Sequence, residues 1–225
     1  MPRRRRSAPS MSKPRVPDPP ANLSKKGLQP ATLPAGTRLA HFYGVAHAAG
    51  QFNPGKGAGR FHPIKTPSGA SIPTLYAGAS WEAAAMETIF RTMPSDRLPT
   101  AVPRALVHRY GACLIELLRD VRVIPLEGYN LRRLGLIRAQ LLEPGPKHYP
   151  RTARWAEALY AAYRRVGGLR WYSRQFDGAQ SFLFFGDRVA KAVRVAEDLG
   201  GCSTGASRSM VEWIASAAEI TITEP

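Results

Sequence analysis

The sequence predicts a single mixed α+β domain behind a disordered basic tail. A length of 225 residues suits one sizeable domain. A hydrophobic content of 44% with a mean hydropathy of −0.25 is ordinary for a globular protein. The predicted strands and helices alternate irregularly, unlike the regular order of a doubly wound parallel sheet. Residues 1–33 carry many basic and proline residues but few large apolar ones, so this segment cannot offset its ordering entropy. We therefore assign residues 1–33 to the tail and residues 34–225 to the domain.

The net charge of +16 is distributed unevenly along the chain. Residues 1–30 hold eight Lys and Arg residues against one Asp, a charge of +7, and the other 195 residues carry +9. An arginine-rich tail could bind nucleic-acid phosphates, or act as a targeting peptide, although no apolar segment follows it. A start at Met11 would remove its four leading arginines. No apolar run approaches the roughly 20 residues that cross a bilayer, so no membrane association is expected.

The strand pattern is clearest where β-branched and aromatic residues gather in short runs. The predicted strands are residues 39–45, 72–76, 105–110, 112–118, 121–124, 181–185 and 219–223. Between the first two lies a Gly- and Pro-rich loop, residues 51–59, whose amide groups could face a phosphate or could form a plain surface loop. The loop lacks the pattern of an NTPase phosphate loop, so ATP hydrolysis is not expected.

The helix after residue 80 has the clearest start signal. Ser80 stands at the N-cap position, and Glu82 places a carboxylate in the first turn. Glu87 follows Ala83 and Ala84 by one turn, on a face that small side chains leave open. Further helices are predicted over residues 130–142, over 152–166 with Thr152 as the cap, and over 210–218.

Cysteine and histidine spacing argues against a metal centre. Cys113 and Cys202 have no CxxC or His-rich neighbourhood, which indicates free thiols in a reducing, cytoplasmic compartment. The five histidines lack metal-ligand spacing, so neither a metal nor a disulfide is expected.

Four residues lie in separate short motifs that are spread along the chain. Arg60 lies in GRF, Tyr76 ends PTLY, Glu87 follows that Tyr by eleven residues on an Ala-rich helix, and Ser173 lies in WYSRQ before SFLFFGD. Together, over residues 36–188, these motifs resemble the RES-domain family, named for its arginine, glutamate and serine, whose members are toxins of bacterial toxin–antitoxin pairs.

The resemblance implies a fold similar to the ADP-ribosyltransferase toxins, with two small sheets framing an NAD cleft. It also implies an NAD⁺-degrading toxin that cleaves the nicotinamide–ribose bond and transfers ADP-ribose to inorganic phosphate. Water or a protein side chain remains open as the acceptor. A cognate antitoxin that covers the active site is implied as the partner. A homo-oligomer is left open, and nucleic acid is expected only through the tail or the antitoxin.

The chemistry of that reaction suggests a role for each residue. Bond cleavage builds positive charge on the ribose, which the Glu87 carboxylate would stabilise. The Arg60 guanidinium matches the oxygens of the pyrophosphate, or alternatively holds an inorganic phosphate acceptor. The Ser173 hydroxyl could hydrogen-bond a phosphate or the carboxamide of NAD⁺. Ser173 is not expected to be a nucleophile, because no histidine is spaced to activate it.

Two further candidates carry alternatives. Tyr76 could stack on the nicotinamide ring or serve as a core tyrosine. His41 stands where many family members carry a second arginine. It could bind the ribose or the carboxamide, or be purely structural. This departure leaves open an inactive RES domain. Independently of His41, a non-catalytic module that binds nucleic acid through the basic surface and the arginine-rich tail also remains open.

Overall fold

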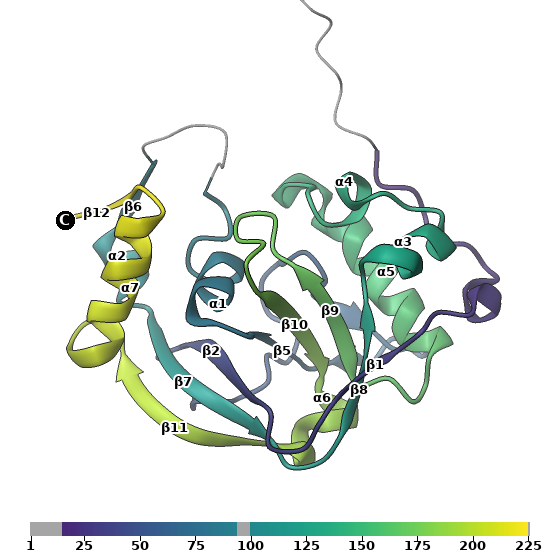
Figure 1. Ribbon diagram of the computed structural model, residues 1–225, viewed down its shortest axis with the longest axis horizontal. Coiled ribbons are helices and arrows are strands. Elements are labelled where there is room, and N and C mark those ends of the chain that lie inside the picture. Colours follow the sequence, from purple (N-terminus) through teal and green to yellow (C-terminus); the bar gives the residue numbers. More distant parts are fainter. Residues whose placement is uncertain (1–14, 94–99, 225) are drawn as a thin grey trace, which may run out of the picture.

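The computed structural model describes residues 15–93 and 100–224. Its centre is one curved eight-stranded sheet in the order β1-β8-β9-β10-β5-β2-β7-β11 (Figure 1). All neighbours are antiparallel except the parallel pair β8–β9. The strands are β1 (Ala31–Leu33), β2 (Arg38–Gly44), β5 (Thr74–Gly78), β7 (Tyr110–Leu117), β8 (Val121–Pro125), β9 (Gly168–Tyr172), β10 (Gln180–Phe185) and β11 (Val193–Gly201).

Two small sheets accompany the large one. Strands β3 (Ile64–Lys65) and β4 (Ser71–Ile72) pair antiparallel, while β6 (Thr100–Pro103) and β12 (Ile220–Thr223) pair parallel. The expectation of two small sheets framing a cleft is therefore wrong in detail. A single curled sheet, continuous through hydrogen bonds from β1 to β11, forms the frame.

Most of the helices lie in the hollow of the sheet or at its two sides (Figure 1). In Figure 1, α1 lies above the middle strands, α7 stands beside β6 and β12, and α3 to α5 gather at the opposite side. The helices are α1 (Trp81–Glu87), α2 (Arg104–Val107), α3 (Gly128–Leu134), α4 (Arg138–Leu141), α5 (Tyr149–Ala162), α6 (Gly186–Val189) and α7 (Gly205–Ala217), with 3₁₀ turns at Leu23–Lys26 (η1), Pro146–His148 (η2) and Ala190–Ala192 (η3). Within the described residues, every helix is too short or too polar to span a bilayer.

Buried apolar side chains form a core on each face of the sheet. One cluster joins α5 to the β9–β10 region around Trp155 and Trp171, and a second joins α1 to α7. A third lies on β5, β7 and β10 around Leu75, Ile115 and Phe184. The α+β prediction is thus confirmed, and the sheet with its packed helices fixes the ends of β5, β9 and α1.

The expectation that residues 1–33 form a disordered tail is wrong for residues 15–33. Val16, Leu23 and Leu28 are all buried, with exposed fractions of 2, 3 and 6%. The Trp155 indole donates to the Pro17 carbonyl at 2.7 Å. A few apolar residues order this segment because they meet an aromatic surface on α5 that composition does not reveal. Residues 1–14, with the leading arginines, lie outside the described residues.

Several element predictions need correction. Residues 105–110 do not form a strand but fall partly in the helical turn α2, and residues 130–142 form two helices divided at Gly135, whose φ is +73°. Thr152 does not cap its helix, because α5 begins at Tyr149. The strand β11 had no sequence prediction.

Candidate functional site

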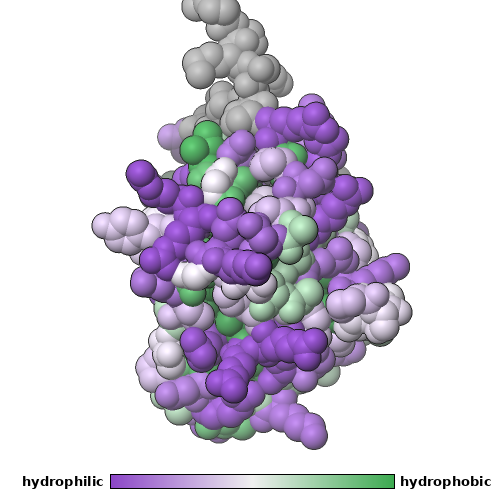
Figure 2. Space-filling view, turned by 90° about the vertical axis from the view of Figure 1, so that its right-hand side faces the viewer, coloured by the Kyte–Doolittle hydropathy of each residue, from purple (hydrophilic) through white to green (hydrophobic). Residues whose placement is uncertain are grey.

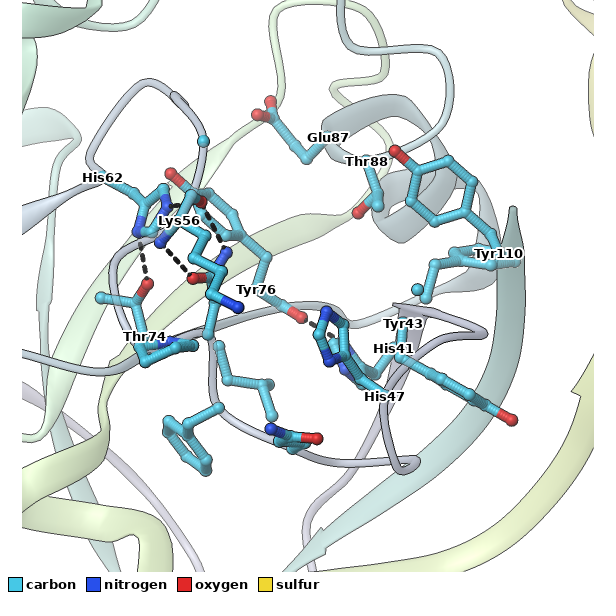
Figure 3. Close-up of a pocket in the computed structure, with 18 of the residues that line it drawn as sticks. His41, Tyr43, His47, Lys56, His62, Thr74, Tyr76, Glu87, Thr88 and Tyr110 are labelled. Atoms are coloured by element: carbon cyan, nitrogen blue, oxygen red, sulfur yellow. Dashed lines mark hydrogen bonds between the residues drawn. The ribbon is translucent and has the colours of Figure 1, made fainter. Parts of the chain in front are cut away.

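A cavity of about 400 Å³ opens beside the C-terminal end of α1. Its walls come from β2, the 51–58 loop, β5, α1 and the start of β7. Figure 3 shows His62, Thr74 and Lys56 on one side of the cavity and His41, Tyr43 and Tyr110 on the other, with Glu87 and Thr88 at the end of the helix. The lining includes three permanent cations, Lys56, Arg91 and Arg109, and a single carboxylate, Glu87. The cavity is therefore suited to an anionic ligand with a cationic or electron-poor centre.

Local packing around Gly78 places Glu87 at this wall. Strand β5 ends at Gly78, and a Cβ there would lie 2.5 Å from the Ala84 backbone nitrogen. Only glycine lets α1 approach β5 this closely. The Ser80 hydroxyl then accepts from the Ala83 N–H at 3.2 Å, so the predicted N-cap is confirmed. Glu87 is the last residue of α1 and is only 7% exposed.

Two side chains hold the Glu87 carboxylate from behind. The Trp171 indole donates to Oε1 at 3.2 Å, and Nη2 of Arg60 lies 3.9 Å from Oε2. The Arg60 side chain is itself 3% exposed, and its Nε and Nη1 have no hydrogen-bond partner in the described part of the chain. The carboxylate therefore has a cation and an N–H donor on its buried side.

The structure brings Arg60 and Glu87 together but leaves Arg60 outside the cavity wall. Its guanidinium lies against Glu87, and its carbonyl accepts from the Thr152 hydroxyl. Arg60 thus contacts the cavity only through its neighbour Glu87, and its Nε and Nη1 nitrogens have no hydrogen-bond partner among the described residues.

Tyr76 both lines the cavity and holds the loop that precedes it. Its hydroxyl accepts from the Phe61 N–H at 3.1 Å, and its ring meets Trp171 edge-to-face with centroids 6.0 Å apart. Burial raises the pKa of the Tyr76 hydroxyl, so it stays protonated at neutral pH. The two readings of Tyr76, a ligand platform and a core residue, are therefore compatible.

His41 presents an acceptor to the site. Its Nδ1 lies 2.6 Å from the Tyr76 carbonyl, which assigns the ring hydrogen to Nδ1. Burial lowers the pKa of His41 to about 4, so the ring is neutral at pH 7. Its Nε2 has no partner in the described residues, and His41 lines the cavity. His41 therefore cannot replace an arginine as a cation, but it offers a lone pair to a ligand hydroxyl or amide.

Ser173 does not reach the cavity wall. It is fully buried directly after β9, and its Oγ accepts from the Gln175 N–H at 3.2 Å. The same turn donates twice to the Arg91 carbonyl, through Arg174 Nη2 at 3.3 Å and Gln175 Nε2 at 3.0 Å. Ser173 thus shapes the turn that fixes the backbone of Arg91, one of the cavity cations.

A family model described as the RES domain matches residues 36–204. The chain belongs to the RES-domain family. A similar solved structure is the M. tuberculosis MbcT–MbcA toxin–antitoxin complex, in which the matched chain shows a TM-score of 0.59 and 11% sequence identity. The match covers 86% of this RES domain chain and 94% of the other chain, and it shows a common fold. A comparison with curated proteins gives no sequence match.

Several site residues of this RES domain were not predicted from its sequence. Arg91, Arg109 and Tyr110 line the cavity, and Trp171 holds Glu87. Their only sequence signal is proximity to the motifs: Arg91 lies four residues after Glu87, and Trp171 opens WYSRQ. Arg109 directly precedes β7, and the pairing of β7 with β2 brings it to the cavity. No local sequence pattern predicts this pairing.

The loop before Arg60 is pinned to the sheet by His62. One ring nitrogen lies 2.7 Å from the Lys56 carbonyl and the other 2.9 Å from the Thr74 hydroxyl. Burial lowers the pKa of His62. Lys56 reaches the cavity lining, whereas Lys147 and His148 do not. In residues 15–93 and 100–224, no group of three or more His, Cys, Asp or Glu side chains could hold a metal ion.

Proposed function

We propose that this RES domain is an NAD⁺-degrading toxin that cleaves the nicotinamide–ribose bond and transfers ADP-ribose to inorganic phosphate. The observation that carries the proposal is the position of Glu87, a buried carboxylate at the wall of an otherwise cationic cavity. A glycosidic cleavage needs a negative charge at the reacting carbon and positive charges around the rest of an anionic substrate.

The cavity residues suit the chemical groups of NAD⁺. A volume of about 400 Å³ lies in the range of small-molecule sites. Lys56, Arg91 and Arg109 would neutralise the pyrophosphate, with arginine offering two parallel donors. The rings of Tyr76 and Tyr110 would supply apolar faces, and Nε2 of His41 would accept from a hydroxyl or the carboxamide.

The residues around Glu87 would keep its charge aimed at the ribose. When bound, NAD⁺ supplies a positively charged nicotinamide as the leaving group. The Glu87 carboxylate would stabilise the positive charge that develops on the ribose, and its burial makes this attraction stronger than in water. Arg60 and Trp171 occupy the other sides of the carboxylate, so that it need not reorient during the reaction.

Product analysis with and without inorganic phosphate identifies the acceptor of ADP-ribose. We expect the full chain to convert NAD⁺ to nicotinamide and a phosphorylated ADP-ribose only when phosphate is present. Free ADP-ribose in both buffers would make the enzyme a hydrolase, and ADP-ribose attached to protein would make it a transferase. Glu82→Gln provides the matched control for Glu87→Gln, because Glu82 lies on the same helix outside the cavity lining.

The toxin role would be tested in growing bacteria. The family assignment and the likeness to a chain of a toxin–antitoxin complex support it. We expect induced expression to deplete cellular NAD⁺ and arrest growth, and Glu87→Gln to relieve both. We also expect coexpression of a cognate antitoxin to restore growth. Growth arrest by Glu87→Gln at equal protein level would contradict the proposal.

A further inference from the structure

We propose that this RES domain carries a second anion site, separate from the NAD cavity, that binds the phosphate groups of a ligand. The site is a concavity of about 330 Å³ lined by Arg119, Arg122, Arg164, Arg165 and Arg188, with Val121, Val166, Gly167 and Val189 as the remaining lining residues. We call it the arginine pocket. It shares no lining residue with the cavity that contains Glu87.

The fold brings these arginines together from three distant segments. Arg119 and Arg122 flank the turn into β8, Arg164 and Arg165 follow α5, and Arg188 lies on α6. Gly167 makes this approach close, because a Cβ there would lie 2.5 Å from a Val189 methyl and 2.9 Å from a Val121 methyl. The convergence is therefore a property of the packed fold, and not of a basic run in the sequence.

Arg188 is fixed before any ligand arrives. Its Nη1 donates to the carbonyls of Tyr163 and Val166, and its Nη2 donates to the Tyr160 carbonyl. Its guanidinium carbon lies 3.7 Å from the centroid of the Tyr160 ring. Arg119 in turn donates to the Arg188 carbonyl at 2.9 Å. This arrangement gives the concavity a rigid cationic wall at little further entropic cost on binding.

Among the described residues, the five pocket arginines lack a carboxylate partner. Elsewhere in the chain, arginines such as Arg38, Arg104 and Arg170 form ion pairs with glutamates. None of the five pocket arginines forms such a pair with any described residue. The adjacent acids are engaged outside the pocket: Asp120 accepts from the Ala35 N–H, and Asp187 from the Tyr160 hydroxyl. Five neighbouring positive charges raise the local potential, which an anion relieves.

The geometry favours phosphate over a carboxylate side chain. One carboxylate has two oxygens and is satisfied by a single guanidinium fork, whereas a phosphate offers three or more oxygens to donors from several directions. The arginines line one concavity from three segments of the chain, which suits a ligand with several phosphate oxygens. Figure 2 shows the side of the molecule that carries β1 and α5, where hydrophilic side chains cover much of the surface from top to bottom.

Calorimetric titration with inorganic tripolyphosphate tests this site. The titrations use the full chain with Arg91→Gln and Arg109→Gln, which removes two of the three cavity cations and so reduces binding in the NAD cavity. We expect Arg122→Gln, Arg164→Gln and Arg165→Gln together to weaken binding by about tenfold or more. The control triple Lys25→Gln, Arg132→Gln and Lys147→Gln removes the same charge from exposed positions outside the pocket, and we expect a loss below about threefold. Thermal melting of each variant establishes that it folds.

Two further titrations identify the source of the phosphate. A single-stranded oligonucleotide that loses affinity in the pocket triple, but not in the control triple, would make nucleic acid the source. If only tripolyphosphate shows that loss, a free nucleotide or polyphosphate is the ligand. Equal losses in both triples, no loss in the pocket triple, or equally tight binding of a glutamate-rich peptide of matched charge would overturn the proposal. With wild-type Arg91 and Arg109, the pocket triple retains NAD⁺ turnover, so the two proposals fail separately.

Discussion

Trp171 links the buried core to the proposed chemistry through one hydrogen bond. Trp171→Phe keeps most of the ring but removes the N–H that donates to Glu87. We expect kcat for NAD⁺ cleavage to fall about tenfold with little change in KM, because a charged hydrogen bond of about 1.5–3 kcal/mol is lost behind the carboxylate and not at the substrate.

The matched control for this variant is Trp155→Phe. Trp155 is equally buried, and its indole donates to the Pro17 carbonyl away from the cavity. Both variants should lose stability, and only Trp171→Phe should lose kcat. A parallel loss of kcat in both would show that general destabilisation, and not the position of Glu87, limits the reaction.

His41 makes the stability of the domain depend on pH. Its pKa is lowered to about 4 in the folded state from an ordinary value of 6.5. Between these values the unfolded chain binds the proton more strongly, so stability falls as the pH drops through this window. At pH 5 the loss from this residue amounts to about 2 kcal/mol relative to pH 7.5.

His41→Asn tests this linkage, because asparagine retains an N–H donor for the Tyr76 carbonyl but does not titrate. Urea unfolding at pH 7.5 and pH 5 should show a smaller difference for the variant than for the wild type. His62, whose pKa is also lowered by burial, leaves a residual pH dependence in both proteins. Identical pH dependence in the two would contradict the burial of His41 as a neutral ring.

The candidate residues show which parts of the site can be predicted from sequence motifs. Glu87, Tyr76 and His41 line the cavity as a group, because strand ends and a capped helix have readable signals. Arg60 and Ser173 come from the same motifs but lie behind the cavity wall. The presence of a residue in one of these motifs predicts that it lies near the site. Whether its side chain faces a ligand depends on packing that comes from other segments.

At the scale of elements, the contact of α1 with β5 is the one on which the site depends most. Gly78→Ala would place a methyl 2.5 Å from a backbone nitrogen of α1, which cannot move aside as a flexible side chain could. We expect a loss of about 2–3 kcal/mol in unfolding free energy, with reduced NAD⁺ cleavage because Glu87 is displaced.

Gly145→Ala is the control, at a glycine where an added methyl group has free space. Its φ is negative, and no atom lies within 4 Å of an added Cβ. Urea unfolding of the two variants should therefore separate them clearly. Equal stability of Gly78→Ala and the wild type would mean that α1 does not approach β5 as closely as described.

The elements that the sequence failed to predict have separate physical reasons. Strand β11 is an edge strand with register irregularities between Val195 and Glu197 and between Asp198 and Gly200, so its apolar alternation is broken. Residues 105–110 have β-type composition, but part of this segment turns into α2. Strands β2, β7, β8 and β10 were predictable, because each buries a run of β-branched or aromatic residues. Their order in the sheet was not, since it depends on long-range pairing.

At the scale of the whole molecule, the segment before β1 is part of the folded body. Leu23 is 3% exposed and belongs to the same buried cluster as Trp155. Leu23→Ala should cost about 2–4 kcal/mol in unfolding free energy, since it leaves a cavity that the surrounding helices cannot fill. Urea denaturation measures this loss.

Lys25→Ala is the control in the same turn, because Lys25 is exposed. It should change stability by less than about 0.5 kcal/mol. If Leu23→Ala were equally neutral, the segment would not be held by the core. Truncated proteins for enzymatic work should accordingly keep residues 15–33.

The most direct test of the central claim is the release of nicotinamide from NAD⁺ by the purified full chain. The wild type, Glu87→Gln and Glu82→Gln would be compared in phosphate buffer at matched concentration, with thermal melting to establish that all three are folded. The account predicts release by the wild type and Glu82→Gln, and a loss of at least about a hundredfold in folded Glu87→Gln. Release by Glu87→Gln at the wild-type rate, or no release by the wild type, would contradict it.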